Sequence, residues 1–134
     1  GFIPVFIANR YFPECVTGSV VVGLCALAGH QFSLFVGFRG GKGVATALGV
    51  CLAVAPLQAF LALCVFVVAV AVTGFVSVGS MLASCSLSVF FVGTGMPTPW
   101  IFGSLLMAGL ICFRHKENIR RLMRREERHW RKRK

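Results

Sequence analysis

The fold is decided by residues 44–72, which read VATALGVCLAVAPLQAFLALCVFVVAVAV. This apolar stretch carries no charged side chain, and roughly twenty such residues in a helix cross the hydrocarbon core of a bilayer. Pro56 interrupts it, and a proline inside a helix removes a backbone hydrogen bond and kinks or ends the helix. We therefore expect a short helix near Val44–Ala55 and a second helix over Pro56–Val72.

Similar apolar runs lie on both sides of this stretch, at Cys15–Ala28, Phe75–Val92 and Trp100–Phe113. The chain has 134 residues, of which 57% are hydrophobic and 13% are charged, whereas a soluble domain carries about 25% charged residues. The runs are too many and too long for a signal peptide. The composition predicts an all-α integral membrane protein, a multi-span helical bundle with about five full or short spans plus a partial first one at Gly1–Ala8.

Residues 1–134 are expected to form a single transmembrane domain, because no stretch has the composition of a separate soluble unit. Small residues recur inside the apolar runs, where they would let helices pack closely. Examples are Gly79, Ser80, Ser84 and Gly103.

Positive charge is concentrated in two places. The formal net charge is +10, and eleven of the fourteen Lys and Arg residues lie within 114–134. A basic segment directly after an apolar run usually faces the cytoplasm and its anionic lipids. Arg39 and Lys42 are the only other charges after the N-terminal turn. An even number of crossings must separate the two clusters if both face the cytoplasm, and a break at Pro56 gives four.

The first cluster lies in a glycine-rich segment, residues 30–46, which reads HQFSLFVGFRGGKGVAT. Glycines let the backbone form a concave nest of N–H groups that holds anions, and a helix starting at Val44 would add its positive dipole end. The spacing differs from a Walker A loop, because three residues separate Gly37 from Gly41-Lys42 and Gly43 follows the lysine. This argues against a nucleotide triphosphatase and for a simpler phosphate nest. The alternative is a flexible cytoplasmic loop whose charges only set topology.

His30 opens the same segment. A histidine at a membrane boundary titrates near neutrality and can donate to phosphate. The alternative reading is a histidine that only caps a helix or lies at the interface.

The second cluster begins with residues 114–121, RHKENIRR. On a helix His115 and Asn118 share one face, where they could bind phosphate oxygens or a hydroxyl, while Glu117 could hold Arg114 or Arg121 in place. The alternative is a basic amphipathic helix lying on lipid. We favour that alternative from Arg124 onward. Its apolar side would contain Ile119, Leu122, Met123 and Trp130.

These motifs resemble those of a known family. Residues 29–46 look like the second signature of the bacterial acyl-phosphate:glycerol-3-phosphate acyltransferases, the PlsY family, and residues 114–121 look like the third. Residues 1–5, GFIPV, are similar to part of the second transmembrane helix of that family. The matches occur in the right order and span essentially the whole chain.

The resemblance implies a seven-helix enzyme of the bacterial inner membrane, with its active site and C-terminus in the cytoplasm. The family transfers a fatty acyl group from acyl phosphate to the first hydroxyl of glycerol 3-phosphate, giving lysophosphatidic acid and phosphate in phospholipid biosynthesis. It uses no metal and no cofactor. Its partners are these two substrates and membrane lipids, and the basic tail lacks the folded reader or aromatic platform that nucleic acid would require. The oligomeric state does not follow from the resemblance.

The first signature of the family, a Ser-Gly-Asn-x-Gly-Ala-Thr-Asn loop, does not occur in this sequence. We therefore expect the chain to be a fragment lacking the first helix and first motif, and to be inactive alone. By carry-over, the catalytic residues would be His30, Lys42, His115 and Asn118. Phosphate would be held by Arg39, Gly40, Gly41, Lys42 and Gly43, and Glu117 would be the orienting residue. The proton acceptor is left open between His30, His115 and the substrate's own phosphate.

Two other functions compete with this interpretation. A membrane transporter subunit for a phosphorylated solute would also place basic loops at broken helices. Such a transporter usually has polar groups near the middle of the membrane, and the apolar runs here contain no charge. A structural anchor with a lipid-binding tail would explain the C-terminal charges but not the glycine-rich segment.

Overall fold

The computed structural model describes residues 1–33, Gly37 and residues 40–131. Within these residues the chain forms seven α-helices and no strand, which confirms the all-α expectation. They are α1 (Phe2–Tyr11), α2 (Val16–Gln31), α3 (Val44–Val54), α4 (Pro56–Thr73), α5 (Val76–Gly93), α6 (Thr98–Arg114) and α7 (Lys116–Met123).

The break predicted at Pro56 is confirmed. α3 ends at Val54, and Pro56 occupies the first position of α4, where its missing N–H group would have no partner within the helix anyway. α4 closes on Gly74, whose φ of +78° is the left-handed conformation that glycine adopts without strain. Four helices therefore lie between the two cationic clusters, as the parity argument required.

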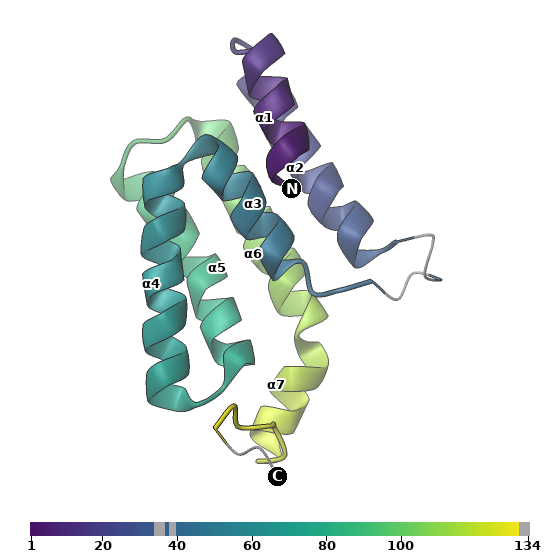
Figure 1. The fold of residues 1–134 in the computed structure, drawn as a ribbon, viewed down its shortest axis with the longest axis vertical. Coiled ribbons are helices and arrows are strands. Elements are labelled where there is room, and N and C mark those ends of the chain that lie inside the picture. The colour runs from purple at the N-terminus through teal and green to yellow at the C-terminus, as the bar shows by residue number, and fades with distance from the viewer. Residues whose placement is uncertain (34–36, 38–39, 132–134) are drawn as a thin grey trace.

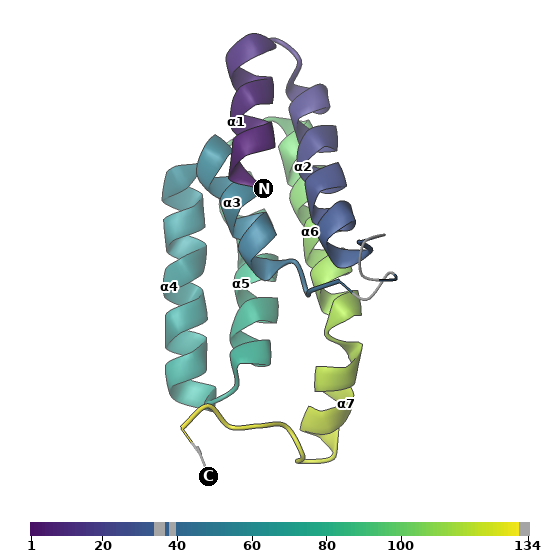
Figure 2. The ribbon, with the colours of Figure 1, turned by 45° about the vertical axis from the view of Figure 1, so that its right-hand side comes forward.

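The helices form a bundle in which α5 packs between α4 and α6, α2 contacts α6, and α1 contacts both α2 and α3. Figures 1 and 2 show that α7 extends beyond α6 at the end of the bundle that also holds the α4–α5 turn. Gly40, which precedes α3, lies beside the end of α6, because Arg114 donates to its carbonyl at 2.7 Å. The described part of the glycine-rich segment thus meets the start of the second cationic motif.

Two of the small residues allow close helix contacts, as expected. A side chain at Gly103 would place its Cβ 2.7 Å from Cγ1 of Val20, across the α6–α2 contact. A Cβ at Gly79 would lie 3.0 Å from the backbone carbonyl oxygen of Phe66 in α4. The absence of a side chain at both positions lets the helix backbones approach.

The outer surface of the bundle is apolar. α4 and α5 each have 18 residues, with mean hydropathies of 2.3 and 1.7, and are long enough to cross a membrane, while α2, α3 and α6 are shorter apolar helices. Large side chains on α4 point outward, namely Leu57, Phe60, Leu61, Leu63, Val67, Val68 and Val72. Exposing these chains to water costs about 25 cal/mol for each Å², so this face suits lipid and the chain is an integral membrane protein.

The structure corrects the expectation of one long basic helix at the C-terminus. α7 ends at Met123, and the backbone then reverses through Arg125, whose φ is 59°. The N–H of Arg125 donates to the carbonyl of Leu122 at 3.0 Å, and that of Glu126 donates to Arg121 at 2.8 Å. This pair of bonds is the Schellman motif that commonly ends a helix, here with arginine instead of glycine in the left-handed position.

Residues 124–131, which we call the C-terminal tail, return to the α4–α5 turn instead of continuing along lipid (Figure 2). The backbone N–H of Trp130 donates to the carbonyl of Gly74 at 2.9 Å. The ring of His129 meets the edge of Phe75, with centroids 5.5 Å apart. The tail therefore covers one end of the bundle.

Candidate functional site

A cavity of about 670 Å³ opens between α3, α4, α5 and α6. Most of its wall is apolar, and the ionisable groups gather where the bundle meets α7 and the tail. The polar lining consists of Lys42, Ser77, Ser80, Ser84, His115, Asn118, Glu127 and Arg128. The apolar lining includes Ala47, Leu48, Cys51, Ala59, Ala62, Leu63, Phe66, Leu87, Met107 and Ile111. The cavity therefore has a charged end and a long apolar wall.

The glycine-rich segment is fixed to the bundle by two side chains that bind its backbone. Gln31, fully buried at the end of α2, donates from Nε2 to the carbonyl of Lys42 at 2.9 Å. Arg114, at the end of α6, donates from Nη2 to the carbonyl of Gly40 at 2.7 Å. Sequence reasoning missed the role of Gln31, because its partner is a backbone atom eleven residues away.

Gly40 and Gly43 are required by this packing, whereas a side chain at Gly41 would displace only the exposed ring of His30. A Cβ on Gly40 would collide with the backbone carbonyls of His30 and Gln31. A Cβ on Gly41 would collide with the imidazole of His30, and Gly43 has a φ of +81°. The backbone of this segment can therefore approach a ligand as closely as it approaches α2.

Among the predicted site residues that the structure describes, three line the cavity, namely Lys42, His115 and Asn118, whereas His30, Gly40, Gly41, Gly43 and Glu117 do not. Arg39 lies outside the described residues. His30 is exposed, and its ring lies against Gly41 on the outer side of the segment. His30 does not line this cavity, because α2 runs on to Gln31 and turns the buried side chain of Gln31 inward instead, and the catalytic role of His30 stays a prediction.

Lys42 and His115 do line the same cavity, together with Asn118. The predicted meeting of the second and third motifs at one site is thus present in the structure. Lys42 extends from the segment before α3, His115 from the junction of α6 and α7, and Asn118 from α7. Burial lowers the pKa of Lys42, Arg121 lowers it further, and Glu127 opposes this shift.

His115 is held in one tautomer. Its side chain is 1% exposed, and Nδ1 lies 2.8 Å from the carbonyl oxygen of Ile111. A carbonyl only accepts hydrogen bonds, so Nδ1 carries the proton and Nε2 keeps its lone pair. Burial lowers the pKa of His115, the positive charge of Lys42 adds to this effect, and the bond to Ile111 and the charge of Glu127 oppose it. The imidazole is therefore set up to accept a proton at Nε2.

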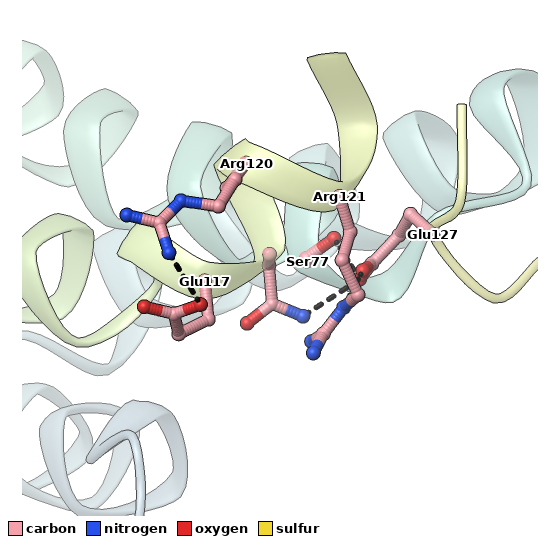
Figure 3. Close-up of polar contacts among 6 residues, drawn as sticks. Ser77, Glu117, Arg120, Arg121 and Glu127 are labelled. Carbon is pink, nitrogen blue, oxygen red and sulfur yellow. Dashed lines mark hydrogen bonds and ion pairs between the residues drawn. The ribbon is translucent and has the colours of Figure 1, made fainter. Parts of the chain in front are cut away.

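Glu127 is the charged residue that sequence reasoning missed. Its Oε1 accepts hydrogen bonds from Asn118 Nδ2 at 2.6 Å and from Ser77 Oγ at 2.9 Å, and its Oε2 accepts from Arg121 Nε at 2.8 Å (Figure 3). Burial raises the pKa of Glu127, but the bonds from Arg121, Asn118 and Ser77 outweigh burial and lower it overall. The only indication in the sequence was that acidic residues are rare, since the chain has just four of them.

Glu117 pairs with a different arginine from the two expected, and its orienting role stays a prediction. Its carboxylate pairs with Arg120 at 3.5 Å, and both side chains are more than half exposed. Figure 3 shows this pair apart from the contacts around Glu127. Arg121 binds Glu127 instead, and Arg114 binds the glycine-rich segment.

Comparisons with known proteins identify relatives of this chain. Residues 1–125 match the glycerol-3-phosphate acyltransferase family. A glycerol-3-phosphate acyltransferase of Geobacter sulfurreducens is 40% identical over 123 residues, which cover 91% of this chain and 62% of that protein. One from Aquifex aeolicus is 39% identical and covers 92% of this chain and 64% of its own length.

Two crystal structures of PlsY (YgiH), an integral membrane glycerol 3-phosphate acyltransferase, superpose on this fold. The glycerol 3-phosphate form gives a TM-score of 0.93 at 38% identity, over 96% of this chain and 64% of that one. The lysophosphatidic acid form gives 0.92 at the same identity.

The chain spans about 62% of the length of the first curated relatives that it matches. The family match itself covers nearly all of this chain and includes both cationic motifs. This chain therefore belongs to the glycerol-3-phosphate acyltransferase family of integral membrane proteins.

Proposed function

We propose that this chain contributes the main phosphate-binding and proton-accepting groups of an enzyme that acylates glycerol 3-phosphate with acyl phosphate. The products are lysophosphatidic acid and phosphate, so the reaction belongs to phospholipid biosynthesis. The observation that supports this most strongly is the cavity that Lys42, His115 and Asn118 line together.

The shape of the cavity suits an amphiphilic donor. Its apolar wall follows α4 from Ala59 to Phe66, a rise of about 10 Å at 1.5 Å per helical residue. A fatty acyl chain can lie along such a wall while its phosphate stays at the charged end. A transporter site for a small phosphorylated solute would not need this apolar length.

The chemistry needs positioning and charge neutralisation more than covalent help, because acyl phosphate is already activated. The hydroxyl oxygen attacks the carbonyl carbon and forms the ester, and the bond from that carbon to the phosphate oxygen breaks. Phosphate leaves with the bonding electron pair, and the hydroxyl proton passes to Nε2 of His115 and then to phosphate. Lys42 and the glycine backbone would neutralise the leaving charge, while Asn118 would align the hydroxyl.

We further propose that the site and the C-terminus lie on the cytoplasmic side of a bacterial inner membrane. Lys42 lines the same cavity as His115 and Arg128 of the C-terminal tail, and the positive-inside rule places such cationic groups in the cytoplasm. Cysteine-accessibility labelling of Lys42→Cys and His115→Cys in intact cells tests this arrangement. Labelling from opposite faces of the membrane would contradict a shared site.

The activity itself is tested with the complete gene product, purified in an uncharged detergent. We expect palmitoyl phosphate and glycerol 3-phosphate to give lysophosphatidic acid and inorganic phosphate in equal amounts. Omitting glycerol 3-phosphate should abolish phosphate release above background hydrolysis. Uptake of glycerol 3-phosphate into proteoliposomes without ester formation would instead establish the transporter reading.

A further inference from the structure

The charged end of the cavity contains an anion-binding arrangement that the chain fills with its own carboxylate. Ser77 from α5 and Asn118 and Arg121 from α7 all donate to Glu127, at 2.6–2.9 Å. The side chain of Glu127 is only 9% exposed, although it belongs to the tail beyond the last helix. A hydroxyl, an amide N–H and a guanidinium N–H that converge on one oxyanion are equally suited to phosphate oxygens.

We propose that Ser77, Asn118 and Arg121 form a phosphate-monoester subsite, and that Glu127 occupies it as a tethered competitor that must withdraw before substrate binds. This rests on the proposed function, since it assigns a regulator to that same site. The tail is thus an autoinhibitory element, and its Glu127 lies beyond residue 125, where the match to the family ends.

Charge requires the two anions to alternate. A phosphate monoester carries between one and two negative charges near pH 7, and a carboxylate bound to the same donors would repel it. The same N–H and O–H groups cannot donate to the carboxylate and to phosphate at the same time. Binding of phosphate at this position therefore displaces Glu127.

The tail is held weakly enough to be displaced. Among the described residues, the other contacts of the tail include a backbone bond from Trp130 to Gly74 and an edge-to-face contact between the rings of His129 and Phe75. Arg125 adopts a left-handed conformation that disfavours a residue with a side chain. Segments with few buried contacts open locally at small free-energy cost.

The test uses the complete gene product in an uncharged detergent, with inorganic phosphate as the probe. Its affinity is read from phosphorus-31 line broadening. Tail position is read from fluorine-19 NMR of fluorotryptophan, with the Trp130 signal assigned by Trp130→Phe. Trp100, which is 3% exposed in the core, serves as the unmoving reference. Saturating phosphate should shift the Trp130 signal and leave that of Trp100 in place.

The decisive variant is Glu127→Gln, which keeps the shape of the side chain and removes its charge. A tail docked nine-tenths of the time reduces phosphate affinity about tenfold, so this variant should bind phosphate about tenfold more tightly. Glu126→Gln removes the same charge one residue earlier and should stay within twofold of the parent. Equal affinities for the two variants, or weaker binding by Glu127→Gln, would overturn the proposal.

A second variant releases the tail without touching the carboxylate or its donors. Arg125→Pro forbids the positive φ and removes the N–H that bonds to Leu122. It should raise phosphate affinity although it also removes a positive charge. Adding Ser77→Ala to Glu127→Gln should then lower the affinity at least threefold, and no change there would mean that phosphate binds elsewhere.

Dodecyl phosphate distinguishes an amphiphilic ligand from a free one. If it shifts the Trp130 signal at lower concentration than inorganic phosphate does, the subsite receives the phosphate of the acyl donor; equal potency assigns it to the water-soluble substrate. Because no acyl transfer occurs in these titrations, their failure leaves the proposed reaction standing. Conversely, if the enzyme is inactive but Glu127→Gln still binds phosphate more tightly, the proposed reaction is wrong and the proposed subsite is supported.

Discussion

The amide of Gln31 binds the backbone carbonyl of Lys42 at 2.9 Å, and so ties the end of α2 to the residue that precedes α3 by two positions. Gln31 is 0% exposed, and its Oε1 has no partner among the described residues. Burying a polar side chain costs free energy unless the side chain is hydrogen-bonded. Here it fixes the backbone from which the Lys42 side chain enters the cavity.

Gln31→Ala should therefore reduce both activity and stability. The carbonyl of Lys42 would lose its donor, and a partly buried hydrogen bond of this kind contributes about 0.5–1.5 kcal/mol to stability. Displacement of the lysine by about 1 Å is enough to lower kcat/KM by about a hundredfold. Steady-state kinetics and thermal unfolding in detergent measure the two effects. A variant that loses stability while keeping its kcat/KM would show that Gln31 has only a packing role.

Lys42→Ala should lower kcat by at least a hundredfold if the ammonium group neutralises phosphate in the transition state. Lys42→Arg keeps the charge but replaces a compact ammonium group with a planar guanidinium group. This variant should recover part of the rate. The measurement is lysophosphatidic acid formation at saturating substrate. A loss of less than tenfold in the alanine variant would remove Lys42 from the catalytic groups.

The local signals in the sequence predicted much of this site. Pro56 ends one helix and starts another through its own geometry, so the break could be located from one residue. Gly40, Gly41 and Gly43 were predicted to hold phosphate, and that role stays a prediction, because they pack against α2 and do not line the cavity. His115 and Asn118 could be placed on one helix face from their spacing alone.

The remaining features depend on tertiary placement, which no local pattern encodes. Helical spacing offered Glu117 partners three or four residues away. In the structure Arg114 donates to the carbonyl of Gly40, and Arg121 donates to Glu127. Glu117 pairs with Arg120 instead. The position of Glu127 follows from a reversal after α7 that uses arginine where glycine would have signalled a turn.

The tautomer and the burial of His115 predict the pH dependence of the reaction. The neutral imidazole accepts the proton, and its pKa is lowered, chiefly by burial. At acidic pH, kcat/KM should therefore decrease with an apparent pKa below the ordinary histidine value of about 6.5. This acid limb should disappear in His115→Asn. A limb that persists unchanged in the variant would belong to the phosphate of a substrate, which titrates near pH 6.

The same pKa shift affects stability, with a sign that follows from linkage. Unfolded His115 takes up a proton more readily than the buried side chain does. The free energy of unfolding should therefore decrease as the pH falls below about 6.5 toward the lowered native value. This contribution should be missing in His115→Asn, measured by denaturant unfolding in detergent at pH 7.5 and pH 5.5.

Two glycines of α6 give a matched test of the helix packing. A Cβ at Gly103 would lie 2.7 Å from Val20, whereas a Cβ at Gly109 would meet nothing within 4 Å. Gly103→Ala should destabilise the bundle by about 1–3 kcal/mol through overpacking. Gly109→Ala should stabilise it by up to about 1 kcal/mol, because alanine loses less backbone entropy in a helix. Thermal unfolding of both variants in one detergent measures the difference, and equal shifts would mean that α2 and α6 do not pack as closely as this structure places them.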